Sequence, residues 1–352
     1  MRVGHAPLAP VGLFHQGAFR IGTAAAIVVM AMIYAGSRGL RHFDWALATY
    51  ATGTIFAGFA VAYRYALWAQ RPPTKMYLKR GIQTFMERWA VLPRNVGRLG
   101  KLLLDNFVLQ KFITERSIER WIMHACLSWG GMMAFALTFP LVFGWLHFES
   151  VAGNAGIYRL FLFGYPVEEF AVHSVRGFIH FNLLNFSAVL MLLGLVLSIK
   201  LRMHDKGEIA TQMFADDILP LLLLFTVCVT GLMLSVSSNF MAGAGFQFLS
   251  MGHAASVIGL LLYLPFGKLF HIVQRPLSLG VSFYKEAGRT GARAHCLRCG
   301  EDFGSRMHVE DLKTVLDQLG FDFRFGDTHY QEICPRCRRR LLALNQGRAL
   351  GR

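Results

Sequence analysis

Acidic residues are scarce in this sequence of 352 residues. Asp and Glu together number 21, whereas Lys and Arg number 36. Charged residues of both signs make up only 16% of the chain, whereas 54% of its residues are hydrophobic. Such a composition is rare in soluble domains and argues against that class. The net charge of +15 alone would suit nucleic-acid binding, but the basic residues concentrate in loops between apolar blocks. We therefore expect no nucleic-acid partner.

Other features are also missing. Residues 1–16 contain Pro and Gly and lack the short apolar core of a cleavable signal peptide, so we expect none. No internal repeat is found. Only six cysteines are present, and two of them, Cys126 and Cys228, stand alone in apolar stretches. We expect these two to pack as small apolar residues.

Long apolar blocks dominate what remains. A helix that crosses a bilayer needs about 20 largely apolar residues. The sequence therefore predicts an all-α integral membrane protein with about six transmembrane helices. The predicted spans are 21–34 (extended by a turn at either end), 45–68, 121–143, 177–199, 218–236 and 253–270.

Basic residues alternate between the connecting loops. The segment 71–120 is rich in Lys and Arg, whereas the loop 148–176 holds few and the loop 237–252 none. The positive-inside rule places basic loops in the cytoplasm, and an even number of spans puts both termini there. We expect a multi-pass protein of the inner (cytoplasmic) membrane of a prokaryote. Arg38 and Arg41, in the first connection, run against this orientation.

Four regions are predicted along the chain. Gly36 and Gly39 separate the two spans of an N-terminal transmembrane hairpin. A basic, amphipathic cytoplasmic segment follows, and it suits either a helix on the membrane or on a partner, or a solvated connector. A four-helix unit and a small cytoplasmic tail complete the chain. The regions are 1–70, 71–118, 119–276 and 285–352.

Four histidines lie in or at the ends of the last predicted spans. Ionisable groups inside a bilayer are costly and usually functional, although a lone histidine can simply bond to a neighbouring helix. His253 and His271 are eighteen residues apart, which on one continuous helix is five turns and about 27 Å. The predicted topology pairs His124 with His271 near the cytoplasmic face and His180 with His253 near the outer face. Each pair suits a bis-histidine haem, which carries electrons and does not bind oxygen.

These histidines lie in segments that resemble a known family. The stretch from His253 through LPFGKLFHIVQRPL resembles the last ligand-bearing span of the respiratory nitrate reductase gamma subunit, and RWIMHACLSWGGMMAF resembles the first ligand-bearing helix of the same superfamily. That superfamily includes the membrane cytochromes of heterodisulfide reductases and of the sulfite-reduction complex. The resemblance covers 119–276. It implies a four-helix bundle with two b haems, in the electron-transfer subunit of a membrane oxidoreductase complex that connects menaquinone or ubiquinone to cytoplasmic iron–sulfur subunits.

One position departs from the family pattern. The nitrate reductase subunit has both partner ligands on its first ligand helix, ten residues apart, but Ala134 stands ten residues after His124. The partner of His253 must then come from elsewhere. His180 fits best by depth, His173 and His147 are the alternatives, and a protein with a single haem is a further one.

Polar residues near His180 are the candidates for a quinone site. Quinone chemistry needs a proton acceptor and hydrogen-bonding groups near a haem, and Arg176, Glu169 and Asn182 fall within PVEEFAVHSVRGFIHFN. Arg176 is also suited to bind a haem propionate. Side chains that either bind the propionates of the inner haem or reach lipid phosphates are Arg120, Lys268 and Arg275.

The tail contains two C-x2-C knuckles, with Cys296 and Cys299 in CLRCG and Cys334 and Cys337 in CPRC. Four thiolates spaced in this way can close a tetrahedral metal site, and a cytoplasmic location argues against disulfides. The arginines around the knuckles favour a zinc ribbon, while a rubredoxin-like iron site has the same knuckles. Between them, MHVEDLKTVLDQLGFDFRF predicts a short amphipathic helix and then a strand. The competing function for the whole chain is a non-redox transporter or scaffold whose tail binds a partner.

Overall fold

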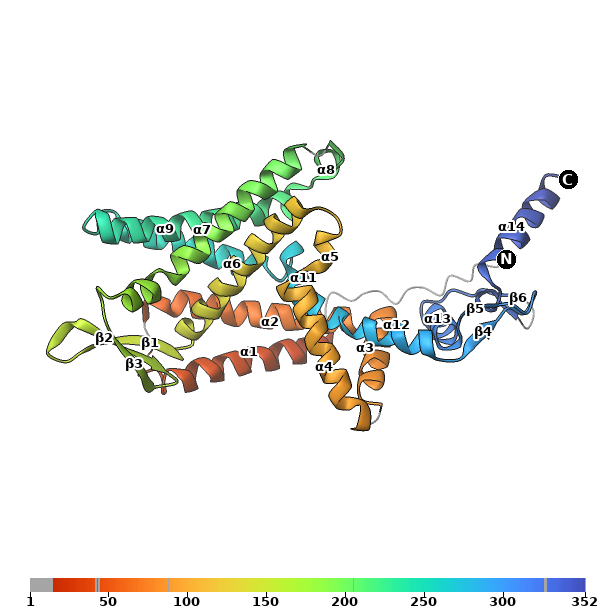
Figure 1. The fold of residues 1–352 in the computed structure, drawn as a ribbon, viewed down its shortest axis with the longest axis horizontal. Coiled ribbons are helices and arrows are strands. Elements are labelled where there is room, and N and C mark those ends of the chain that lie inside the picture. Colours follow the sequence, from red (N-terminus) through yellow and green to blue (C-terminus); the bar gives the residue numbers. More distant parts are fainter. Residues whose placement is uncertain are drawn as a thin grey trace. The chain divides into compact units, whose positions relative to one another are not determined.

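The computed structural model describes residues 15–351 except positions 42, 44, 88, 205 and 326–327, so most of the stretch examined for a signal peptide lies outside the described residues. The chain divides into two compact units. Unit 1 contains Tyr65–Leu103 and Val273–Arg352 together with the N-terminal segment Met1–Gly17, and unit 2 contains Ala18–Arg64 and Leu104–Ile272. Both units are mostly helical (Figure 1). The basic segment after residue 70, up to Leu103, thus groups with the tail, which the sequence did not predict.

Five helices of the described residues are long and apolar enough to cross a membrane, which indicates a membrane protein. The remaining one of the six predicted spans, 45–68, corresponds to α2 (Ala48–Gln70), a helix of 23 residues. Its Thr, Tyr and Gly residues and its single arginine, Arg64, make α2 less apolar than the other five. The five are α1 (Gln16–Gly36), α6 (Ile118–Val142), α7 (Val175–His204), a helix made of a π-helical turn (Phe214–Ile218) and α9 (Leu219–Phe240), and α10 (Phe246–Tyr263).

Glycines let α6 and α7 pack closely in unit 2. A Cβ added at Gly130 would lie 2.5 Å from Cγ of Met191, and one at Gly194 would lie 2.8 Å from Cγ of Leu127. Small residues are the usual means of bringing two membrane helices together. Met191 also packs beside the buried Cys228 of α9, which behaves as the small apolar residue that the sequence predicted.

The connection between α6 and α7 is a three-stranded antiparallel sheet, which the predicted all-α fold did not include, although helices dominate the described residues. The strands are β1 (Leu146–Val151), β2 (Asn154–Leu162) and β3 (Tyr165–Ala171), in the order β1-β2-β3. They lie at one end of the helices of unit 2 (Figure 1). Phe170, 4% exposed, packs against Phe148 and against Phe181 of α7. Alternating aromatic side chains thus give the sheet a buried face.

A turn interrupts the predicted helix 253–270. α10 ends at Tyr263, a short 3-10 turn covers Lys268–Phe270, and α11 (His271–Ser278) begins at the second histidine. Pro265 explains the interruption, because proline lacks the backbone N–H that would continue the helix and its ring crowds the carbonyl four residues earlier. The turn is closed by the N–H of Gly267, which donates to the carbonyl of Tyr263 at 2.9 Å. His253 and His271 therefore lie on two separate helices, and their common direction does not follow from helical periodicity.

Unit 1 joins the amphipathic segment to the tail. Its helix α3 (Pro72–Phe85) packs on α12 (Gly280–Thr290) and α13 (Arg306–Gln318). The Arg80 guanidinium donates to Asp311 of α13 through Nη2 at 2.8 Å and through Nε at 3.1 Å. The Tyr284 hydroxyl donates to the same carboxylate at 3.1 Å. These contacts make α3 a structural part of this unit.

The predicted helix and strand between the knuckles are confirmed as α13 and β6 (Arg324–Phe325). The first cysteine knuckle lies in the loop between β4 and β5, and the second follows the small hairpin β6–β7. The remaining elements are Trp45–Leu47, Trp89–Val91 and Tyr330–Glu332 (3-10), Leu104–Val108 (π-helical), α4 (Leu92–Leu103), α5 (Lys111–Thr114), α8 (Lys206–Thr211), β4 (Arg293–His295), β5 (Asp302–Ser305), β7 (Thr328–His329) and α14 (Pro335–Ala349).

Candidate metal centre and membrane histidines

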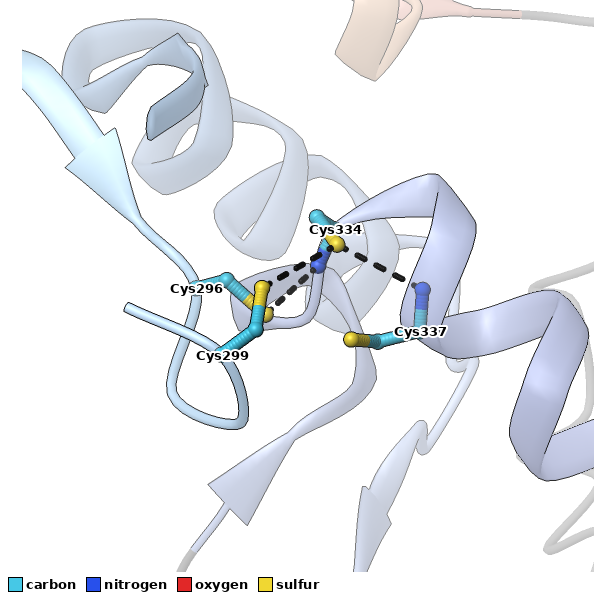
Figure 2. Close-up of side chains that lie close together, drawn as sticks. All are labelled: Cys296, Cys299, Cys334 and Cys337. Carbon is cyan, nitrogen blue, oxygen red and sulfur yellow. Dashed lines mark hydrogen bonds between the residues drawn. The ribbon is translucent and has the colours of Figure 1, made fainter. Parts of the chain in front are cut away.

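The four tail cysteines converge on one point. Cys296 and Cys299 come from the loop between β4 and β5, and Cys334 and Cys337 come from the first turn of α14. All four sulfur atoms lie within 4.8 Å of one another, and Figure 2 shows the side chains pointing toward a common centre. The structure thus brings together every cysteine of the predicted site, and this group can hold a metal ion.

The spacing of the sulfurs matches a tetrahedral site. A metal–sulfur bond of about 2.3 Å gives a tetrahedron whose edges are about 3.8 Å. The Sγ atoms of Cys299 and Cys334 are 3.8 Å apart, far beyond the length of about 2.05 Å of a disulfide bond. Zinc and iron form bonds to thiolate of similar length, so this distance agrees with either metal.

Backbone N–H groups stabilise negative charge on the cluster. The Cys296 sulfur accepts from the N–H of Cys334 at 3.2 Å and from that of Arg298 at 3.4 Å, and the Cys334 sulfur accepts from the N–H of Cys337 at 3.4 Å. Burial raises the pKa of the Cys296 thiol, but these donors outweigh it and lower the pKa to about 6. Because the thiolate is the form that binds metal, the backbone prepares at least one ligand.

His124 is held from the segment that precedes its helix. Its Nδ1 lies 2.8 Å from Oε1 of Gln110, while the Gln110 amide nitrogen donates to the carbonyl of Phe107 at 3.3 Å. With the amide oxygen as acceptor, this contact corresponds to the tautomer of His124 that carries its proton on Nδ1. This tautomer carries its lone pair on Nε2, the nitrogen that a metal would bind.

Gln110 is itself firmly placed. It is 2% exposed and has a φ of +51°, which is unusual for a residue with a side chain. Two indoles of α6 hold its neighbours, since Trp121 donates to the carbonyl of Leu109 at 2.8 Å and Trp129 to that of Val108 at 3.2 Å. Strained backbone that the surroundings hold in place is common at functional sites.

His253 and His271 repeat the arrangement with different acceptors. The Thr230 hydroxyl donates to the carbonyl of Thr226 at 2.6 Å, so its oxygen accepts from Nδ1–H of His253, 2.9 Å away. The Nδ1–H of His271 donates to the carbonyl of Lys268 at 2.5 Å. A carbonyl can only accept, which fixes the tautomer of His271. All three imidazoles therefore present Nε2 as the metal-binding nitrogen.

His180 differs from the other three. Its Nε2 faces Oε2 of Glu168 at 3.3 Å, and its ring packs on Phe170 with centroids 4.8 Å apart. The nitrogen that would bind iron is thus the one in contact with a carboxylate. In this conformation the ring does not fit a haem ligand, and it would have to turn away from Glu168 to become one.

The alternatives to His180 lie on the sheet side of the same region. His147 is in β1, where its Nε2 lies 3.3 Å from Glu149 and its ring stacks on Phe161. His173 is exposed in the turn before α7. Neither is brought onto another predicted ligand by a described contact.

Most of the residues predicted for quinone or propionate binding contact polar partners that were not among the predicted residues. Arg176 contacts Glu168 at 3.2 Å, and Glu169 pairs with Arg159 across the sheet. Asn182 bonds within α7, to the carbonyl of Phe178 and to Asn185. The inner candidates Arg120 and Arg275 lie in α6 and α11, and Lys268 pairs with Asp217 at 2.6 Å.

Sequence reasoning missed Gln110 and Thr230, which orient two of the predicted ligands. Both are common polar residues at long sequence separations from their histidines, and only Thr230, a hydroxyl in a strongly apolar span, carries a weak signal.

No family model, curated protein or solved structure matches the chain. The resemblance to the dihaem cytochromes therefore stays a prediction.

Proposed function

We propose that this chain is the cytochrome b membrane subunit of a respiratory oxidoreductase complex. In this proposal His124 and His271 hold one b haem, and His253 with a partner holds the other. A haem held by two histidines supplies a one-electron redox couple with no open iron position. Electrons would pass between menaquinone or ubiquinone and a cytoplasmic iron–sulfur subunit bound to the basic surface.

The observation that carries the proposal is the shared tautomer of three histidines. His124, His253 and His271 each have Nδ1 held by an oxygen acceptor from a different element. Metal-bound histidines almost always donate the other ring N–H in this way, because the acceptor fixes the ring and raises the basicity of the ligand.

His180 is the proposed partner of His253, and it must exchange Glu168 for iron. The exchange would free Glu168 near Arg176, Glu169 and Asn182, where we place the quinone. A carboxylate released by haem binding is suited to accept a proton from quinol. His173 and His147 are the competing partners.

The reduced-minus-oxidised spectrum of the purified full-length protein tests the proposal. We expect b-type haem absorption and two haems per chain. His124→Ala or His271→Ala should remove one haem, and His253→Ala the other. His204→Ala, at the exposed end of α7, is the matched control and should leave both haems in place. Absence of haem from the wild-type protein would refute the proposal and favour a transporter or scaffold.

The partner of His253 is decided by the same measurement. Ala variants of His180, His173 and His147 should differ in haem content. Only His180→Ala should lose the haem that His253→Ala loses. Full haem content in His180→Ala would transfer the assignment to whichever of the other two variants loses it. One haem per wild-type chain would leave a single site.

For the tail we propose zinc in the four-cysteine site. The adjoining arginines (Arg298, Arg336, Arg338, Arg339 and Arg340) are typical of a zinc ribbon that binds a partner. Metal analysis of the purified protein should give one zinc and no iron beyond the haem iron. One non-haem iron per chain with a ferric-thiolate absorption band would instead indicate a rubredoxin-like redox site.

A further inference from the structure

A polar cavity lies among the ends of three candidate spans in unit 2. Its volume is about 210 Å³, and it is lined by Arg202, Thr211, Gln212, Asp217 and Lys268. Arg202 is in the last turn of α7, Asp217 is in the first turn of the helix 214–240, and Lys268 follows the end of α10. Because these three helix ends share one face of the bundle, a bilayer crossed by the three candidate spans would place the cavity at the depth of lipid headgroups.

The charges of the cavity do not cancel. Lys268 Nζ lies 2.6 Å from Oδ1 of Asp217, whereas the nearest Arg202 nitrogen is 3.5 Å from the same oxygen. The other carboxylate oxygen, Oδ2, accepts from the N–H of Met213 at 3.0 Å. The Asp217 carboxylate is therefore bound mainly by Lys268 and by the backbone N–H of Met213. Most N–H groups of the Arg202 guanidinium remain available to bind a ligand. Two cations and one carboxylate leave a net charge of +1, which a single monoanion balances.

Exposed apolar side chains adjoin the lining residues along the chain. Met213 and Phe214, directly after the lining residue Gln212, are 59% and 64% exposed, and Phe266, two residues before Lys268, is 65% exposed. Side chains of this kind at the end of a membrane span meet acyl chains rather than water. A ligand with an anionic head and apolar chains suits both the lining and these neighbouring side chains.

We infer that this cavity binds the phosphodiester group of an anionic membrane phospholipid. Arg202 is the main phosphate ligand, through the paired N–H donors that suit phosphate geometry. Lys268 supplies a second positive charge, and the Gln212 amide supplies neutral donor capacity. Basic pockets between membrane helices are the type of site that recognises lipid headgroups. Lys268 is also a candidate for a propionate of the inner haem, but the test of this site needs no haem, so it stands or falls separately from the proposed function.

Native mass spectrometry of the full-length protein in detergent tests this site, with dioleoyl-phosphatidylglycerol and dioleoyl-phosphatidylcholine as probes. We expect tighter binding of phosphatidylglycerol, and about a fivefold loss of that affinity in Arg202→Gln, as for one basic contact at a membrane surface. Lys200→Gln removes an exposed cation from the same end of the same helix without touching the cavity, and should bind like wild type.

A variant that binds phosphatidylglycerol at least as tightly as wild type shows that a change in the cavity does not weaken binding merely by misfolding the protein. Asp217→Asn raises the net charge of the cavity to +2 and should bind phosphatidylglycerol at least as tightly as wild type. Equal affinity of Arg202→Gln and Lys200→Gln would overturn the inference, as would equal binding of the two lipids by wild type. Displacement of the bound lipid by inorganic phosphate at a comparable concentration would show a site for free phosphate and would likewise overturn it.

Discussion

The cysteines of the tail and the histidines of the membrane helices are both predicted metal ligands, but the two sets differ in how they are assembled. The four cysteines come from two local turns, and their sulfurs lie within 4.8 Å. The histidines come from three long helices and the short α11, and Nδ1 of three of them, His124, His253 and His271, lies against an oxygen atom. A site built from short-range turns is specified by spacing in the sequence. The proposed site between membrane helices would be specified by packing, and these three Nδ1 contacts are the observations that favour it.

The largest expected effect is on the cysteine site of the tail. Cys334→Ser removes a buried ligand whose sulfur also accepts from the N–H of Cys337. Structural zinc contributes about 10 to 16 kcal/mol in small zinc-binding domains, so we expect the metal content to fall from one ion per chain to near zero. Hydrogen exchange should show an unfolded tail. Cys126→Ser in α6 is the control, and full metal content in Cys334→Ser would contradict the prediction.

A second prediction examines whether the cysteine site needs the rest of unit 1. Arg80→Met leaves the buried carboxylate of Asp311 without its ion pair, which we expect to cost about 2 kcal/mol of the unfolding free energy. Arg306→Met, which breaks only the exposed pair with Glu310, should cost less than about 0.5 kcal/mol. Hydrogen exchange of α13 measures both. The metal content should stay at one ion per chain, because the knuckles are local, and loss of metal in Arg80→Met would show that they are not.

The third prediction sharpens the histidine side and rests on the proposed haem. Gln110→Leu removes the acceptor on Nδ1 of His124, and loss of such an acceptor typically weakens metal binding about 10- to 100-fold. We also expect a higher midpoint potential for one haem, since the ring becomes a poorer donor to iron. Gln110→Glu restores an acceptor with full negative charge and should lower the potential below that of wild type. Equal potentials in all three proteins would show that Gln110 has only a packing role.

The smallest effect concerns pH and the tail. Burial lowers the pKa of His329, which is 4% exposed, with Lys313 adding to the shift. The unfolded chain therefore binds the proton more readily, so the stabilisation is complete above pH 6.5 and is lost as the pH falls toward the folded pKa. His329→Asn keeps a side-chain acceptor for the N–H of Gln331 and should give a flatter profile. Tail exchange rates at about pH 7.5 and about pH 5.5 test this, and parallel profiles would contradict it.

Local features of the sequence predicted local features of the structure well. The C-x2-C knuckles predicted a cysteine cluster, the stretch 307–325 predicted a helix and a strand, and apolar blocks predicted the membrane helices. The break after Tyr263 was visible as Pro265 and Gly267, but the eighteen-residue histidine spacing was given more weight than proline chemistry.

Features that depend on tertiary packing were not predictable from one sequence. The sheet 146–171 has strands of mixed polarity between two membrane helices, and its aromatic face is defined only by contact with Phe181. The pairing of Arg80 with Asp311 spans 231 positions. The contact of His180 with Glu168 occupies the nitrogen that would bind iron, and it depends on β3, which lies within the segment 148–176 that was predicted as a loop.

The turn between α10 and α11 separates the position of His253 in α10 from the position of His271 at the start of α11. In a continuous helix, one inserted or deleted residue rotates every side chain that follows by about 100°. The residues Leu264–Gly267 absorb such a change, so His271 and its acceptor, the carbonyl of Lys268, can shift as a short module while His253 keeps its bond to Thr230. The two histidines can thus be repositioned separately during evolution or design, and grafting the segment 268–278 into a related bundle would transfer His271 with its acceptor without altering His253.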